Sequence, residues 1–185
     1  MSGLRKPSKA DLQAAYNQTV PDIIGPHLKV LFCGINASIY SAAVGHHFAR
    51  PGNRLWKTLH RSGFTDRRLS PAEDHTLLDY GYGMTNIVAR ATARADELDN
   101  AELQQGYIDL VEKITQYRPE WLAILGVTAY RVAFAQRRAQ IGRQATQIGD
   151  TQIWVLPNPS GLNAHYQLDD LAAVYAELRS AIATA

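Results

Sequence analysis

Three stretches of the chain carry the small and polar residues from which a binding site could be built. Each adjoins apolar residues of the kind found in buried strands. In an open α/β sheet, ligands bind beyond the carboxyl ends of the strands, where these stretches would lie. The stretches are Gly34-Ile35-Asn36-Ala37-Ser38, residues 85–97, and Pro157-Asn158-Pro159-Ser160-Gly161-Leu162-Asn163. We therefore expect them to meet at one site.

Two side chains in or near the first stretch could contact a ligand, although each also has a purely structural explanation. Asn36 carries an amide that donates and accepts hydrogen bonds, but an Asn after a strand is more often a turn former than a catalyst. Phe48 lies in Gly-His-His-Phe-Ala-Arg-Pro-Gly-Asn at 45–53, which is too polar and too rich in Gly and Pro for a normal helix. Its ring could stack on a planar ligand or pack into the core.

The third stretch predicts a rigid loop with an apolar tip. Pro157 and Pro159 stiffen it, Gly161 lets it bend, and Leu162 follows at the expected tip. An exposed apolar residue on a rigid loop can act as a wedge between stacked bases. The alternative is that Leu162 folds back onto the core.

Histidine and cysteine residues do not show the spacing of a metal site. His46 and His47 are adjacent, so they would face different directions, and there is one cysteine, Cys33, with no His-x-x-x-His spacing. We expect no metal site. The single cysteine also excludes an intramolecular disulfide, as is typical of the reducing cytoplasm. No apolar run approaches the length of about 18 residues that crosses a bilayer, so we expect a cytoplasmic protein without membrane contact.

Apolar spacing predicts the elements that would position these stretches. Strands are expected at 28–34, 84–88 and 121–125, with 146–148 and 152–156 forming a hairpin around Gly149-Asp150. Helices are expected at 11–20, 53–62, from Pro71 to Gly81 or Gly83, and at 97–117, 128–136 and 168–182. This alternation predicts a single-domain α/β three-layer sandwich, with a mostly parallel central sheet flanked by helices. Residues 1–10 are expected to form a loose tail, and residues 11–185 the domain.

Basic residues are concentrated although the net charge is only +2. Such clusters can neutralise phosphates and steer a protein onto nucleic acid, but they equally fit solvated helix faces. One cluster holds Arg50, Arg54, Lys57, Arg61, Arg67 and Arg68 against the single acid Asp66, and the other holds Arg131, Arg137, Arg138 and Arg143.

Six stretches resemble the mismatch-specific uracil-DNA glycosylase and thymine-DNA glycosylase family, within the uracil-DNA glycosylase superfamily. They appear in the family's order and span roughly residues 26–183, which makes the match specific. The stretches are Phe-Cys-Gly-Ile-Asn at 32–36, Gly-His-His-Phe at 45–48, Pro-Gly-Asn-Arg-Leu-Trp-Lys at 51–57, Gly-Met-Thr-Asn-Ile-Val at 83–88, Leu-Ala-Ile-Leu-Gly at 122–126 and Ile-Trp-Val-Leu-Pro-Asn-Pro-Ser-Gly-Leu at 153–162.

The resemblance implies a base-binding pocket. Asn36 matches the residue that holds the hydrolytic water, and Phe48 matches the aromatic residue that stacks on the flipped base. Gly34 and Ile35 line the same pocket, and Asn86 matches a polar position near it. The family's usual proline after the asparagine is alanine at position 37 here, which removes a constraint on the backbone of that loop.

The resemblance also implies a loop that enters the duplex. Asn158-Pro159-Ser160-Gly161-Leu162 matches the loop that fills the space left by the flipped nucleotide, and Gly161 and Leu162 match residues at the widowed partner base. The family often has an arginine shortly after this wedge, where the chain has Asn163-Ala164-His165. We therefore expect weaker contacts to the partner base and less strict discrimination among substrates.

Asp96 is the candidate for a catalytic carboxylate. An asparagine can orient a water but cannot take its proton, whereas a positioned base typically adds about 10²–10⁴-fold. Asp96 lies in Arg94-Ala95-Asp96-Glu97, at the expected start of the long helix. The alternative, which we favour from the sequence, is that Asp96 is only the N-cap of that helix.

The implied function is that of a monofunctional DNA glycosylase, acting as a monomer and without a cofactor. Its partner would be duplex DNA with uracil mispairs, notably opposite guanine, with single-stranded DNA left open. The main rival is a non-catalytic module that binds mismatched DNA without releasing a base. A nucleotide-binding enzyme is disfavoured because no phosphate-binding glycine motif is present. A serine hydrolase is disfavoured because Ser160 lies in Pro-Ser-Gly rather than in a Gly-x-Ser-x-Gly elbow.

Overall fold

A five-stranded sheet runs through the middle of the molecule in the computed structural model, which describes residues 4–184. The strand order is β2-β1-β3-β5-β4, and only the edge strand β4 is antiparallel to its neighbour. The strands are β1 (Val30–Ser38), β2 (Tyr82–Thr92), β3 (Trp121–Leu125), β4 (Gly142–Ile148) and β5 (Thr151–Leu156). The expected α/β sandwich with a mostly parallel sheet is confirmed.

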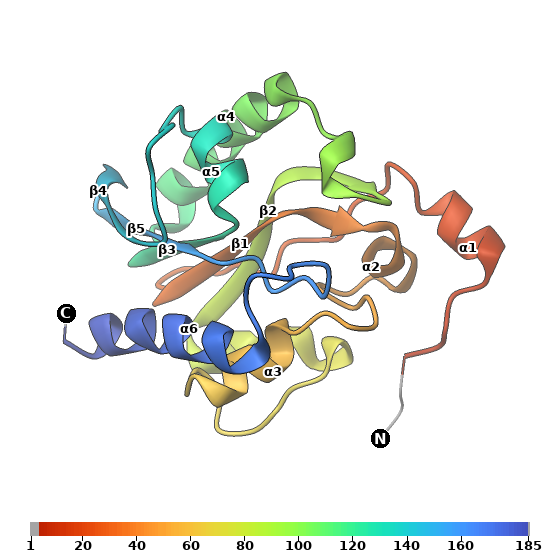
Figure 1. Ribbon diagram of the computed structural model, residues 1–185, viewed down its shortest axis with the longest axis horizontal. Coiled ribbons are helices and arrows are strands. Elements are labelled where there is room, and N and C mark those ends of the chain that lie inside the picture. The colour runs from red at the N-terminus through yellow and green to blue at the C-terminus, as the bar shows by residue number, and fades with distance from the viewer. Residues whose placement is uncertain (1–3, 185) are drawn as a thin grey trace.

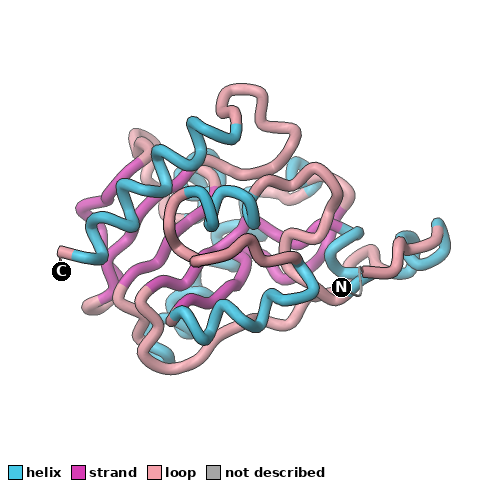
Figure 2. Tube along the Cα trace, turned by 90° about the horizontal axis from the view of Figure 1, so that it is seen from below, coloured by secondary structure: helices cyan, strands magenta, loops and turns pink. Residues whose placement is uncertain are grey.

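Helices cover both faces of the sheet. In Figure 1, α4 and α5 lie above it and α3 and α6 below it. Figure 2 shows the N-terminal helix α1 at one end of the molecule and the end of α6 at the other. The helices are α1 (Lys9–Ala14), α2 (Ile39–Val44), α3 (Leu55–Arg61), η1 (Pro71–Tyr80), η2 (Ala95–Glu97), α4 (Asn100–Tyr117), α5 (Val127–Ala133) and α6 (Leu168–Ala183).

The central strands are apolar because they are buried on both sides. In β1, Val30 and Phe32 join the core beneath α3 and α6, whereas Leu31 and Cys33 join the core beneath α4 and α5. All five residues of β3 are buried. This two-sided burial explains why these strands show no alternation of polar and apolar residues.

Two strands extend further than the sequence indicates. We expected the first strand to end at Gly34 and the second to span 84–88, but β1 continues to Ser38 and β2 to Thr92. The reason is their mutual pairing: Gly34 pairs with Asn86, Asn36 with Val88, and Ser38 with Thr92 after an irregularity. Two of the stretches expected as loops are therefore largely strand, because backbone pairing continues where the side chains become polar.

The start of the long helix was also misplaced. Helix α4 begins at Asn100 rather than at residue 97, and its N-cap is Asp99, whose side chain accepts from the backbone N–H of Glu102. Ala95–Glu97 forms a separate 3-10 turn. Aspartate is a good cap at either position, so composition alone could not distinguish Asp96 from Asp99.

The other differences are local. Helix α2 was not predicted, and the segment 71–80 is a 3-10 helix ending at Gly81 rather than an α-helix. The first helix begins at Lys9 with Ser8 as its N-cap, and Pro7 is buried. The expected loose tail over residues 1–10 lies partly outside the described residues.

The hairpin at the far edge of the sheet is confirmed. Strands β4 and β5 pair antiparallel, with Ile148 opposite Thr151, and Gly149 adopts a positive φ of 56° in the turn between them. Among the helices of residues 4–184, none has both the length and the apolar character needed to span a membrane.

Gly106 provides a test of how α4 sits on the sheet. A Cβ at this position would lie 2.2 Å from the carbonyl oxygen of Ile87 in β2. Alanine favours helices over glycine by about 1 kcal/mol, but overpacking costs about 1–3 kcal/mol and displaces the helix. We expect Gly106→Ala to lower the melting temperature, while Gln104→Ala on the exposed side of α4 leaves it nearly unchanged. A Gly106→Ala protein more stable than wild type would contradict this packing.

Candidate active site

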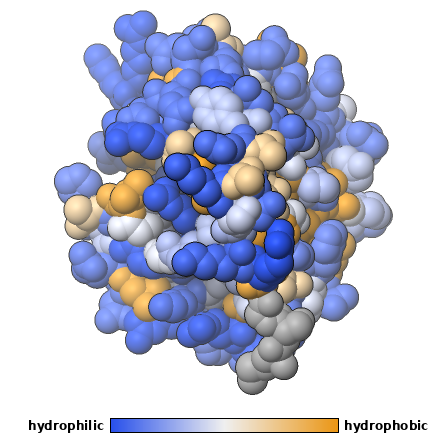
Figure 3. Space-filling view, turned by 90° about the vertical axis from the view of Figure 1, so that its right-hand side faces the viewer, coloured by the Kyte–Doolittle hydropathy of each residue, from blue (hydrophilic) through white to orange (hydrophobic). Residues whose placement is uncertain are grey.

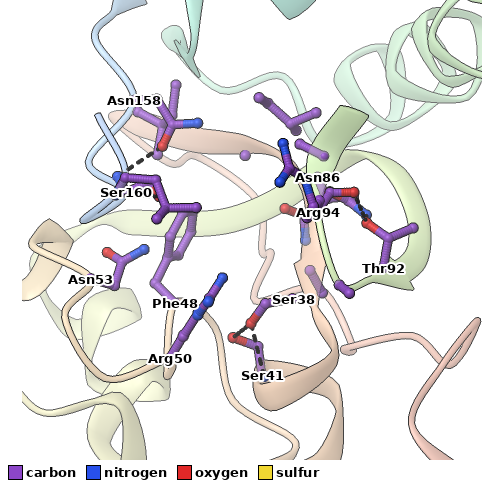
Figure 4. A pocket seen from close by; sticks show the side chains of 18 of the residues that line it. Ser38, Ser41, Phe48, Arg50, Asn53, Asn86, Thr92, Arg94, Asn158 and Ser160 are labelled. Carbon is purple, nitrogen blue, oxygen red and sulfur yellow. Dashed lines mark hydrogen bonds between the residues drawn. The ribbon is translucent and has the colours of Figure 1, made fainter. Parts of the chain in front are cut away.

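A cavity of about 560 Å³ opens at the carboxyl ends of β1 and β2. It collects residues that lie far apart in the sequence, from β1, the loop before α3, β2, η2 and the loop after β5 (Figure 4). Of the residues singled out from the sequence, those lining it are Gly34, Ile35, Asn36, Phe48, Asn86, Asp96, Asn158, Ser160, Leu162 and Asn163. Pro159 and Gly161 belong to the same loop but do not line the cavity.

The side chain of Asn36 is fixed by hydrogen bonds from its amide nitrogen. Its Nδ2 donates to the carbonyl of Arg90 at 3.0 Å and to Oγ1 of Thr92 at 2.8 Å. Thr92 Oγ1 in turn donates to the carbonyl of Arg94 at 2.7 Å. The Oδ1 of Asn36 accepts no hydrogen bond from residues 4–184, so this oxygen is available to a donor in the cavity.

Arg90 anchors the segment that holds Asn36. Its guanidinium donates to both carboxylate oxygens of Glu102, at 2.5 and 2.9 Å, and to the carbonyl of Glu97 at 3.2 Å. Tyr16 adds a hydrogen bond from its hydroxyl to Glu97 at 2.6 Å. These contacts join β2, η2, α4 and the N-terminal segment, and no local sequence pattern indicated them.

Gly34 lets a polar and an aromatic side chain approach the floor of the cavity. A Cβ at this position would lie 2.4 Å from Oδ1 of Asn86 and 3.0 Å from Cζ of Phe48. Asn86 is only 8% exposed, and its side-chain amide makes no hydrogen bond with the described residues. The cavity therefore presents the ring of Phe48 together with an amide able to donate and accept.

The backbone that carries Phe48 is held by buried polar groups. Phe48 has a positive φ of 51°. The buried carboxylate of Asp74 accepts from the backbone N–H of His47 at 3.0 Å and contacts Nδ1 of His46 at 3.1 Å. His47 Nε2 donates to the carbonyl of Pro21 at 2.9 Å. Phe48 is half-buried: it packs against the core, as one explanation of this residue expects, and it also borders the cavity.

Asp96 lies at the rim of the cavity and is not a helix cap. Its carboxylate makes an ion pair with Arg94, whose Nη2 is 2.6 Å from Oδ2, and its side chain is 64% exposed. The cap that we favoured from the sequence is therefore wrong, since Asp99 caps α4. The hydrogen bonds from Arg94 lower the pKa of Asp96 below its usual value, so this carboxylate is ionised at neutral pH.

The loop after β5 is internally hydrogen-bonded and presents Leu162 to solvent. Asn158 Oδ1 accepts from the backbone N–H of Ser160 at 2.9 Å, and Asn163 Nδ2 donates to the carbonyl of Asn158 at 2.9 Å. The backbone N–H of Asn163 donates to the carbonyl of Ser160 at 3.0 Å. Leu162 is 74% exposed, so the alternative in which it folds back onto the core is wrong.

The basic clusters contain fewer available charges than the sequence suggests. Arg61 pairs with Asp169 and Arg67 with Glu73, while the guanidinium of Arg54 contacts backbone carbonyls. Within residues 4–184, Arg50, Lys57 and Arg68 have no side-chain partner, and Arg50 lines the cavity. The face at the carboxyl ends of the strands, turned to the viewer in Figure 3, is mainly hydrophilic, with hydrophobic side chains in small separate groups.

The described residues contain no group of three or more His, Cys, Asp or Glu arranged to hold a metal ion. The side chains that line the cavity include amides, hydroxyls, a carboxylate, arginines, an imidazole and an aromatic ring. This set can bind a planar polar ligand, orient a water and stabilise charge.

Comparison with known proteins identifies the family. The family model of the uracil DNA glycosylase superfamily matches residues 21–179, which include the whole sheet and all the site segments. The chain belongs to the uracil DNA glycosylase superfamily. The fold is also similar to the solution NMR structure of a candidate uracil DNA glycosylase from Methanosarcina acetivorans, with a TM-score of 0.58 at 15% identity. That alignment covers 88% of this chain and 98% of the other.

The close approach at Gly34 can be tested in this glycosylase. In Gly34→Ala the added methyl group would collide with Asn86 and press on Phe48, narrowing the cavity without imposing a strained φ. We expect base release from uracil-containing DNA to fall by about 10-fold or more, since a misplacement near 1 Å can cost about 10²-fold. The matched control is Gly25→Ala, where an added Cβ meets nothing within 4 Å. Equal rates for the two variants would contradict this account of the pocket floor.

Stability should also depend on His47. Burial lowers the pKa of this histidine, with the nearby Asp74 and Asp22 opposing the shift. The unfolded chain therefore binds a proton near pH 6.5 while the folded protein still resists it, so His47 contributes stability that is lost as the pH falls below about 6.5. Thermal melts between pH 8 and 5 should show a shallower decline for His47→Gln than for wild type. The variant His165→Gln, at an exposed histidine that is not among the groups acting on His47, should follow wild type, and a parallel decline in all three would exclude this contribution.

Proposed function

We propose that this protein is a mismatch-specific, monofunctional uracil-DNA glycosylase that acts as a monomer in the cytoplasm. The observation that carries the proposal is the juxtaposition of Asn36, with its unoccupied Oδ1, and Phe48 in one cavity beneath the exposed Leu162. Base excision requires a pocket for the flipped base, a hydrogen-bond acceptor that orients the water, and a side chain that fills the space left in the duplex.

The cavity suits the flipped base. The ring of Phe48 offers a surface on which a pyrimidine can stack. Uracil presents an N–H donor between two carbonyl acceptors, and the amide of Asn86 can donate to a carbonyl and accept from that N–H. Because Asn86 is nearly buried and makes no hydrogen bond within residues 4–184, this pairing would satisfy an amide that otherwise lacks a partner.

Hydrolysis follows from the position of Asn36. Its Oδ1 accepts a hydrogen bond from a water and turns the water's lone pair toward the anomeric carbon of the deoxyribose. The glycosidic C–N bond breaks with its electron pair going to the base, the water oxygen bonds to the carbon, and a water proton leaves. Hydrogen bonds to the base stabilise its developing negative charge.

Asp96 assists this step at the sugar. Its carboxylate is ionised at neutral pH, because Arg94 lowers its pKa. A low pKa weakens it as a proton acceptor but keeps a negative charge near the sugar cation. We therefore assign to Asp96 an electrostatic role as well as the acceptance of the water proton.

The loop from Asn158 to Asn163 enters the duplex and contacts the partner strand. Leu162 fills the gap left by the flipped uracil, and the backbone around Gly161 contacts the widowed base, preferentially guanine. Asn163 offers a shorter, uncharged side chain where the family often has an arginine nearby. We expect cleavage of uracil opposite guanine, with single-stranded uracil accepted as well.

The test is single-turnover cleavage of labelled DNA carrying U opposite G, U opposite A, T opposite G, or U in a single strand. Wild type should yield alkali-sensitive sites, fastest with U opposite G. Removal of the positioned water or of the carboxylate should each cost about 10²-fold, so Asn36→Ala and Asp96→Asn should both be slow.

The control for Asp96→Asn is Asp109→Asn, because Asp109 is an exposed acid on α4 whose carboxylate accepts a hydrogen bond from Gln105. An undiminished Asp96→Asn enzyme would confine Asp96 to its ion pair with Arg94. If wild type binds mismatched DNA but releases no base from any substrate, the protein is the non-catalytic binding module instead.

A further inference from the structure

The guanidinium of Arg54 lies beneath the loop that carries Leu162. Its Nη1 donates to the carbonyl of Tyr166, and its Nη2 donates to the carbonyls of Ser160 and Asn163, the latter at 3.0 Å. Its Nε donates to the carbonyl of Pro159 at 3.4 Å. The backbone N–H of Arg54 also donates to Pro159, at 3.0 Å. One residue thus contacts four carbonyls of a loop more than a hundred positions away.

The loop before α3, which contains Gly52, is also in close backbone contact with the loop that carries Leu162. A Cβ at Gly161 would lie 2.7 Å from the carbonyl oxygen of Gly52. The base of the loop has its own anchor, since the hydroxyl of the buried Tyr175 donates to the carbonyl of Pro157 at 3.1 Å. Arg54 therefore contacts the part of the loop beyond this anchor, where Leu162 projects.

An irregular loop exposes carbonyls that no strand or helix satisfies, and each ordered residue costs conformational entropy. A guanidinium presents five N–H donors in a fixed planar fork, so one arginine can satisfy several carbonyls that converge on it. The loop is then ordered before DNA arrives, and the entropy cost is not incurred during binding.

The geometry points to Arg54 as a positioning residue that holds the Leu162 loop in the conformation needed to enter a duplex. This inference rests on the proposed glycosylase function. It removes Arg54 from the residues available to phosphates, although it lies in the basic cluster of the sequence. It also predicts that Arg54 matters when a base must be extracted from a duplex and matters little when the base is already unpaired.

The experiment compares Arg54→Gln and Arg54→Lys with wild type in single-turnover cleavage of uracil opposite guanine and of single-stranded uracil. We expect a loss of 10-fold or more on the duplex and less than 3-fold on the single strand for both variants, since a lysine cannot reproduce the planar fork. Arg179→Gln is the matched control: it removes one charge and one arginine–carbonyl hydrogen bond, to Gly63, away from the site. It should match wild type on both substrates.

Salt dependence distinguishes positioning from phosphate binding. Loss of one phosphate contact reduces the slope of the logarithm of the DNA-binding constant against the logarithm of salt concentration by about 0.9. Substitution of a positioning residue leaves this slope unchanged. A reduced slope, or equal losses on duplex and single strand, would overturn the inference.

Hydrogen exchange makes the test independent of activity. The backbone N–H groups of Leu162 and Asn163 should exchange faster in Arg54→Gln than in wild type, with unchanged exchange in β3. If wild type releases no base, the proposed function fails, while the exchange result still tests whether Arg54 holds the Leu162 loop. Unchanged exchange in Arg54→Gln would overturn this role of Arg54 even in an active enzyme.

Discussion

The parallel pairing of β1 with β2 continues past the point where their apolar residues end, and the site depends on this continuation. Gly34 pairs with Asn86, and two residues later Asn36 pairs with Val88. The irregularity before Ser38 and Thr92 turns the end of β2 so that Thr92 and the carbonyl of Arg90 reach the Asn36 amide. A side-chain amide in a loop would be mobile, whereas the amide of Asn36 is carried by a strand of the sheet.

The pocket floor requires a residue without a side chain. Asn86 and Phe48 come from different segments and meet above Gly34, where even one methyl group would collide. The surrounding polar groups serve the same geometry, because Asp74 and His47 hold the backbone of Phe48 in a conformation with positive φ. Buried polar contacts of this kind fix one arrangement of the pocket at the cost of dependence on pH.

Several arginines of this protein contact other parts of the same chain. Arg90 ties β2 to α4, Arg94 holds Asp96, and Arg54 contacts the Leu162 loop. Because these arginines are engaged within the protein, fewer basic side chains are available to phosphates than the sequence contains.

The sequence by itself determined the layered α/β fold, the hairpin around Gly149, and the set of segments that line the cavity. It could do so because burial on both faces leaves apolar runs, turns leave glycine, and the family's short motifs survive in order. Only the tertiary structure decided that Asp99 rather than Asp96 caps α4, that Leu162 faces solvent, and that Arg54 contacts carbonyls of the loop after β5. These outcomes depend on contacts between residues far apart in the chain, and local residue type carries no record of such contacts.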